Sequence, residues 1–131
     1  MDKEFTTDNC SVVPDYDQSE CCVEHDWAYW KGGSFKERWE ADGKFLECIK
    51  ETRSAFLAPF RWLGVRVGGI GLFPSSFRWG YGWKWPTTRA PADDRSPISE
   101  ESQREVLEAN LVEARERDRR RREEISLLRN Q

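Results

Sequence analysis

Histidine is the scarcest titratable residue of this chain: His25 is the only one among 131 residues. Histidine is also the side chain whose ordinary pKa lies closest to neutral pH, and it is the most frequent general base in enzymes. The scarcity restricts acid–base chemistry to one place. An enzyme of this kind would have to use His25.

Long apolar runs are missing as well. No segment reaches the roughly 20 apolar residues of a membrane-spanning helix, and residues 55–74 are interrupted by Arg61, Arg66 and several glycines. The first four residues are not followed by the apolar segment of a signal peptide. We predict no spanning helix, and either an export signal has been removed or the protein is cytosolic.

The four cysteines bear on the compartment. With 131 residues and 37% apolar content, the chain is long enough for one small domain. Four cysteines in such a domain favour two disulfides and an oxidising environment, hence a secreted or periplasmic protein. The alternative is a cytoplasmic protein whose thiols are reduced.

Turn and cap signals predict a mainly α fold. Residues 1–18 are rich in turn-forming residues, and Ser19 can cap a helix that runs to about Trp30. Two glycines at 32–33 end it, and the capping box at 34–37 opens a second helix to about Ala58. Residues 59–98 are rich in Gly, Pro and aromatics, which predicts an irregular segment.

A third helix is predicted over residues 99–131, as a unit separate from a domain of residues 1–98. This segment holds nine acids and eight arginines, with few apolar residues beyond Val112. Such a pattern favours a solvated helix stabilised by charge pairs four residues apart. Nucleic-acid binding by the four arginines at 119–122 is the alternative, weakened by the acids on either side.

Helical spacing gathers chemically useful side chains. The first predicted helix places four of them on one side, namely Cys21, Cys22, His25 and Tyr29. The short glycine turn predicts that the second helix lies antiparallel to the first, so Asp42 can face His25. A carboxylate bonded to Nδ1 of His25 would leave Nε2 free to accept a proton. Asp26 points about 100° away from His25 and could hold a hard cation.

These residues resemble a known family. The pattern Cys-Cys-x-x-His-Asp at 21–26, followed by Tyr29 and by Ala-Asp-x-x-Phe-x-x-Cys at 41–48, is similar to the active-site helices of the phospholipase A2 superfamily. The resemblance implies that His25 activates water, that Asp26 binds calcium, and that Asp42, supported by Tyr29, orients His25. It covers roughly residues 8–50.

The resemblance extends to the cysteines. It implies disulfides between Cys21 and Cys48 and between Cys22 and Cys10. A further family disulfide would join the positions of Ala28 and Ala41, and both of its cysteines are missing here. Because both cysteines are replaced by alanine, the pair of changes supports the prediction that the first and second helices face each other at these positions.

The predicted calcium loop departs from the family pattern. The resemblance implies carbonyl ligands from Asn9, Ser11 and Val13, with the backbone N–H of Ser11 as the oxyanion donor. The family's loop is rich in glycine, whereas residues 9–13 contain none. Calcium is therefore less firmly implied than the pairing of His25 with Asp42, because special backbone angles are harder to reach without glycine.

The family resemblance implies calcium-dependent hydrolysis of the sn-2 ester of phospholipids. One alternative is a non-catalytic, disulfide-stapled module on the same frame that binds lipid or protein. The other is a zinc site drawn from the cysteines and His25. The adjacent cysteines and the absence of a C-x-x-C motif disfavour zinc.

A membrane surface is the predicted partner. Residues 52–92 contain no acid and six Lys and Arg residues, so this segment carries +6 and the rest of the chain −9 of the net −3. Aromatic rings beside arginines suit an anionic lipid surface. We predict that residues 60–85 supply it through seven side chains, namely Trp62, Trp79, Trp83, Trp85, Arg61, Arg66 and Arg78. The alternatives are that the tryptophans cover the helical core or, less favoured, stack single-stranded nucleic acid.

Overall fold

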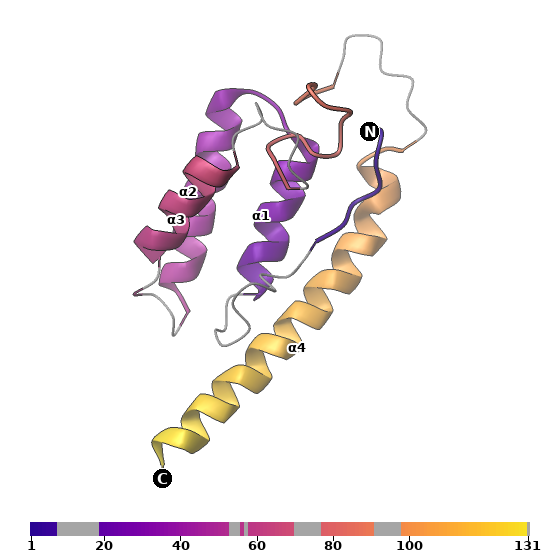
Figure 1. Ribbon diagram of the computed structural model, residues 1–131. Helices are drawn as coiled ribbons and strands as arrows, with labels where there is room; N and C mark the ends of the chain where they lie inside the picture. Colours follow the sequence, from indigo (N-terminus) through magenta and orange to yellow (C-terminus); the bar gives the residue numbers. More distant parts are fainter. Residues whose placement is uncertain (8–18, 53–55, 57, 70–76, 91–97, 131) are drawn as a thin grey trace.

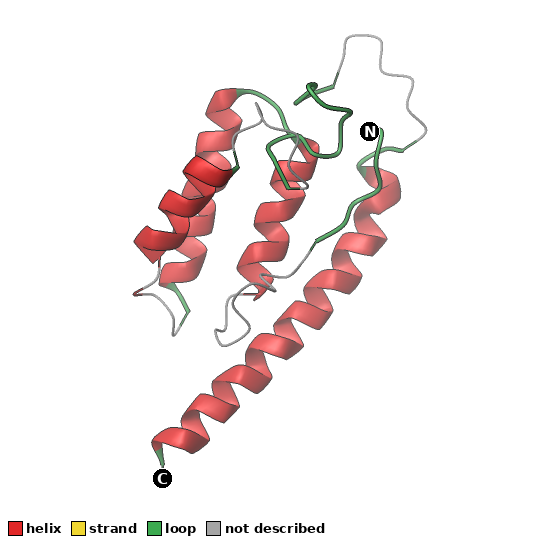
Figure 2. Cartoon of the chain, viewed as in Figure 1, coloured by secondary structure: helices red, strands yellow, loops and turns green. Residues whose placement is uncertain are grey.

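A computed structural model of the chain describes residues 1–7, 19–52, 56, 58–69, 77–90 and 98–130. Within these residues it contains four α-helices and no strand: α1 (Ser19–Lys31), α2 (Phe35–Lys50), α3 (Ala58–Gly68) and α4 (Arg104–Arg129), with a short 3-10 turn at Glu101–Gln103 (Figure 2). The predicted mainly α class is confirmed. No helix in the described part of the chain has the length and apolar content needed to cross a bilayer.

The antiparallel pair α1 and α2 lies beside α3 on one side and α4 on the other (Figure 1). Gly32 and Gly33 have φ of +69° and +133°, which explains why glycine ends α1 there. The predicted disulfide between Cys21 and Cys48 is present, with Cα atoms 5.7 Å apart. Cys22 is disulfide-bonded as well, and its predicted partner, Cys10, lies outside the described residues.

The second predicted helix is too long. Ser34 does cap α2, and its side chain accepts a hydrogen bond of 3.2 Å from the backbone N–H of Glu37. However, α2 ends at Lys50, and a separate helix, α3, occupies Ala58–Gly68 where irregular chain was predicted. Pro59 lies in the first turn of α3, where its fixed φ suits a helix and its missing N–H costs nothing. The proline starts a helix here.

Residues 77–88 form turns that cover the C-terminal end of α1. The last carbonyls of a helix have no partner within it. Here the carbonyls of Tyr29 and Trp30 accept from the backbone N–H groups of Gly80 and Gly82 at 2.7 and 3.1 Å. The indole N–H of Trp83 donates to the carbonyl of Lys31 at 2.9 Å. Tertiary contacts thus supply the cap of α1.

Three residues predicted to contact a membrane are therefore internal. Trp79 and Trp83 are each 3% exposed, and Arg78 is 2% exposed. Arg78 donates to four carbonyls of the surrounding turns, those of Trp79, Gly80, Trp83 and Thr87. The prediction does not hold for these three side chains, because they organise the turns and the core beneath them.

The first half of α4 belongs to the same core as α1. Leu107, Leu111 and Ala114 are buried in one cluster with Val23 and Trp27. The C-terminal part of α4 continues past the bundle (Figure 1). Arg119 pairs there with Glu123 four residues on, as predicted, and also with Glu116 three residues back. The solvated character is confirmed for this distal half only.

Asp118 of α4 caps the N-terminus of α1. Its carboxylate accepts from the backbone N–H groups of Ser19 and Glu20 at 2.8 and 3.0 Å. The first N–H groups of a helix lack internal partners and carry partial positive charge, so a carboxylate stabilises them. The helix that carries His25 thus depends on a residue close to the other end of the sequence.

Candidate functional site

His25 of α1 and Asp42 of α2 meet in the interior. The Nε2 atom of His25 lies 2.8 Å from Oδ1 of Asp42, and the two residues are 8% and 0% exposed. The predicted contact is confirmed, but the nitrogen is Nε2 and not the predicted Nδ1. A carboxylate that approaches from the opposite helix meets the far side of the imidazole ring. Nδ1 is therefore the nitrogen left for a substrate or water.

Aromatic rings fix the plane of the imidazole. Its centroid lies 4.3 Å from the ring of Tyr29 and 4.5 Å from that of Phe45. The hydroxyl of Tyr29 donates to the same Oδ1 of Asp42 at 2.7 Å, as the resemblance implied. Both motif helices thus supply side chains that hold His25 and Asp42 in register.

Two arginines complete the surroundings of Asp42. Nη1 of Arg66, on α3, donates to Oδ2 at 2.9 Å, and Nε of Arg38 lies 4.0 Å from the same oxygen. Arg66 was predicted to face a membrane, but its guanidinium turns inward, because the buried carboxylate gives it a stronger partner than solvent does.

The electrostatics keep Asp42 ionised. Burial alone would raise the pKa of Asp42, but the hydrogen bonds from His25, Tyr29 and Arg66 stabilise the carboxylate and lower the pKa below its ordinary value. Tyr29 behaves in the opposite way, because burial and the neighbouring carboxylate raise its pKa. Near neutral pH the pair is thus a carboxylate and a neutral phenol that donates to it.

A small cavity of about 80 Å³ adjoins His25 between α1 and α2. It is lined by one side of each helix, including His25, Ala28, Ala41 and Phe45, and by the disulfide of Cys21 and Cys48. Ala28 of α1 and Ala41 of α2 both line it, and their small side chains leave this space open. A cavity of this size can hold more than one water molecule.

The predicted calcium ligands do not assemble a site within the described residues. Asp26 accepts a hydrogen bond of 2.6 Å from the hydroxyl of Thr7. Asn9, Ser11 and Val13 lie outside the described residues. Calcium takes six to eight oxygen ligands, and the described part of the chain shows no cluster of three or more His, Cys, Asp or Glu side chains suited to a metal. The fit of calcium thus depends on the loop at 9–13.

The zinc alternative is excluded for the cysteines that the structure describes. Zinc binds cysteine as a thiolate, whereas Cys21, Cys22 and Cys48 are all disulfide-bonded.

The remaining predicted membrane residues lie nearer the surface. Trp85 is 45% exposed, whereas Trp62 and Arg61 are half-buried, and Trp62 packs edge-on against Trp39. A more apolar surface lies elsewhere. It is formed by four side chains with exposed fractions between 56% and 72%, Phe56, Phe60, Leu63 and Val67, which we call the α3 face.

Sequence reasoning missed the two arginines that surround Asp42. The signal for Arg38 was available, since it lies four residues before Asp42 on the same helix and forms an i,i+4 pair with it. Arg66 gave no such signal, because α3 was not predicted and 24 residues separate it from Asp42. Comparison of the chain with protein-family models, curated proteins and solved structures found no match.

Proposed function

We propose that this chain is a lipid hydrolase that cleaves the sn-2 ester of phospholipids, as its resemblance to the phospholipase A2 superfamily implies. The observation that carries the proposal is the buried contact of 2.8 Å between Nε2 of His25 and Asp42. A histidine whose second nitrogen is fixed by a carboxylate has the geometry of a general base. The cavity beside it provides room for the attacking water.

In the proposed reaction, Nδ1 of His25 takes a proton from water while the water oxygen attacks the ester carbonyl carbon. Asp42 keeps its hydrogen bond to Nε2 and balances the positive charge of the imidazolium. The C–O bond of the ester then breaks, and His25 returns the proton to the leaving alkoxide. The products are a fatty acid and a lysophospholipid.

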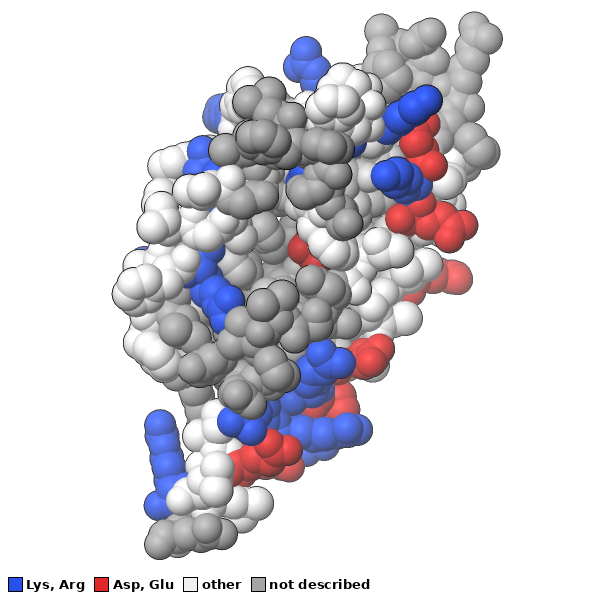
Figure 3. Space-filling view, in the orientation of Figure 1, with Lys and Arg blue, Asp and Glu red and all other residues white. Residues whose placement is uncertain are grey.

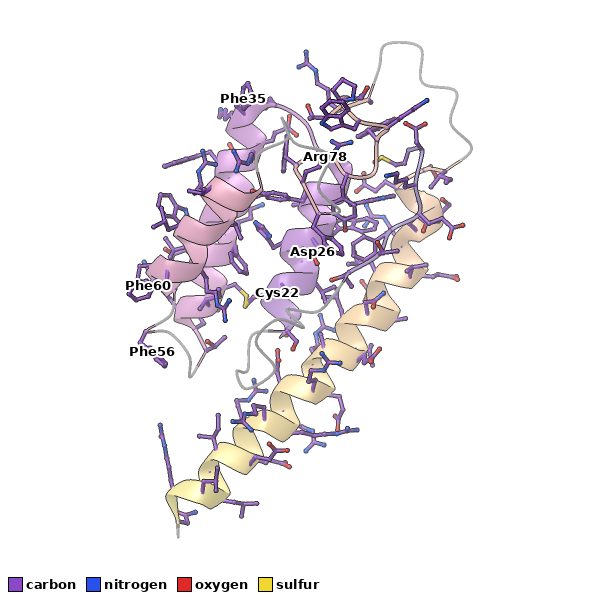
Figure 4. All side chains as sticks on the ribbon, in the orientation of Figure 1. Cys22, Asp26, Phe35, Phe56, Phe60 and Arg78 are labelled. Carbon is purple, nitrogen blue, oxygen red and sulfur yellow. A yellow bond between two sulfur atoms is a disulfide. The ribbon has the colours of Figure 1, made fainter. Side chains whose placement is uncertain are left out.

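The α3 face supports a phospholipid surface as the partner. Phe60, Leu63 and Val67 recur at spacings of three and four, so they share one side of α3, and Phe56 precedes the helix. Phe56 and Phe60 project from the outer edge of the bundle, whereas Phe35 lies at the other end of the α2–α3 pair (Figure 4). In Figure 3, the visible surface over α2 and α3 is mostly uncharged, and the charged side chains on it are mainly Lys and Arg. Most of the visible Asp and Glu side chains lie along α4. This combination suits insertion into an anionic interface.

A direct assay tests the hydrolase. We expect release of fatty acid from the sn-2 position of phosphatidylglycerol in mixed micelles, measured by mass spectrometry with added calcium. Because the resemblance implies calcium on Asp26, EGTA is expected to abolish release. Equal release of fatty acid in EGTA would show that the chain is a hydrolase and that only the predicted calcium requirement is wrong. Absence of release under both conditions, from protein with both disulfides formed, would instead favour the non-catalytic binding module.

The membrane surface has its own test. Replacing Phe60 and Leu63 with Ser is expected to weaken binding to phosphatidylglycerol vesicles about tenfold or more, because two side chains lose their apolar burial. Co-sedimentation measures the change. The matched control is V112S, whose side chain on α4 is 62% exposed. Unchanged binding by the double variant would contradict the proposal, and a change from dimer to monomer in ultracentrifugation would identify a second copy as the partner.

A further inference from the structure

The carboxylate of Asp42 is engaged at both oxygens. Oδ1 accepts from Nε2 of His25 at 2.8 Å and from the hydroxyl of Tyr29 at 2.7 Å. Oδ2 accepts from Nη1 of Arg66 at 2.9 Å. Rotation of the carboxylate about its Cβ–Cγ bond would move both oxygens and so disturb the bonds to His25 and to Arg66 together.

Arg38 closes this arrangement into a ring. Its Nε donates to the hydroxyl of Tyr29 at 3.1 Å, and its Nη2 donates to the carbonyls of Val65 and Arg66 at 3.0 and 2.6 Å. Arg38 thus holds the phenol of Tyr29 on one side of Asp42. On the other side it holds the backbone of α3 that carries Arg66. Each member of the ring is fixed by two neighbours.

The side chain of Arg66 is itself held from outside. Its guanidinium lies over the ring of Trp39, 5.0 Å from the centroid, and the side chain is 26% exposed. A planar guanidinium can stack on a ring and donate along its edge at the same time, which the ammonium of lysine cannot do. The site therefore uses a property specific to arginine.

We infer that the guanidinium of Arg66 is a positioning group of the site: it fixes the Asp42 carboxylate, and through it the orientation and tautomer of His25. The effect of Arg66 on the rate of hydrolysis rests on the proposed function, whereas its effect on the orientation and tautomer of His25 does not. The positioning role makes α3, which lies outside the residues that resemble the family, a part of the hydrolytic apparatus. The alternative is that Arg66 only fastens α3 to α2 as a structural ion pair.

Kinetics distinguish these two roles. We expect kcat to fall about tenfold in R66K and about 100-fold in R66M, with KM within about twofold of the wild-type value, because misplacement of a catalytic group lowers the rate more than substrate binding. R66K keeps the charge but loses the stacked guanidinium. A kcat in R66K equal to that of the wild type would overturn the inference. R66K alone provides this test if R66M does not fold.

A spectroscopic readout does not depend on turnover. The chain has one histidine, so the ¹⁵N shifts of a single imidazole report its tautomer, recorded at the same pH for every variant. We expect the wild type to carry the proton on Nε2, and R66K and R66M to show a mixture of tautomers. R104M, a change of an exposed arginine on α4, is the control and should show the wild-type tautomer.

The two readouts separate the possible failures. If the wild type hydrolyses no lipid but the tautomer shifts in the Arg66 variants, the proposed function fails and the positioning role stands. If the wild type is active and both variants keep a pure Nε2–H tautomer and an unchanged kcat, Arg66 is only a structural ion pair.

Discussion

Replacing His25 with Gln is expected to lower the rate of phospholipid hydrolysis by about 10²- to 10⁴-fold, the contribution typical of a general base. Glutamine can still donate an N–H to Asp42, but it cannot take a proton from water. The helices should stay in place, because the disulfide of Cys21 and Cys48 and the contacts of Tyr29 and Phe45 do not depend on the imidazole nitrogens. Fatty-acid release and circular dichroism on the same sample measure both effects.

The control for this variant is E47Q, on the exposed side of α2. Glu47 has a side chain 69% exposed and pairs with Lys50, away from the interior that holds Asp42. It should retain the wild-type rate. Turnover of H25Q close to that of E47Q would remove His25 from the mechanism and with it the proposed chemistry.

Removing the disulfide between Cys21 and Cys48 is expected to produce the largest loss of stability. The two residues are 27 positions apart in the sequence. In the chain-entropy model, opening a loop of this length lowers the free energy of unfolding by about 3–4 kcal/mol. The double variant C21A/C48A tests this value by urea denaturation followed through tryptophan fluorescence.

The denaturation slope provides an internal check. Without the cross-link the unfolded chain is less compact and exposes more surface, so the m-value should rise as the midpoint falls. A loss below about 1 kcal/mol with an unchanged m-value would show that the cross-link does not constrain the unfolded chain as the entropy model requires.

The two motif helices could be predicted because their signals are local. Ser34 with Glu37 marks the start of α2, two glycines mark the end of α1, and spacings of three and four residues place His25 and Tyr29 together. The pairing with Asp42 followed from the short turn between the helices. Which imidazole nitrogen meets the carboxylate depends on side-chain direction across the helix pair, which spacing does not encode.

The segment after residue 50 could not be predicted in the same way. Pro59 can end a helix or begin one, and the choice depends on the packing of α3 on α2. The tryptophans near residue 80 gave a pattern typical of an interface, yet Trp83 is needed inside because Lys31 has a carbonyl without a helical partner. Arg66 was assigned to the surface because its partner, Asp42, is distant in sequence.

The cap that Asp118 places on α1 has a consequence for the order of synthesis. Ser19 precedes the carboxylate that binds its amide by 99 residues. A ribosome that has completed only the first hundred residues has delivered His25, Asp42 and Arg66, but not the group that closes the first turn of the helix beneath them. Capping of α1 is therefore a late event: during translation the nascent chain carries His25 and the residues that surround it before it carries the carboxylate that caps their helix.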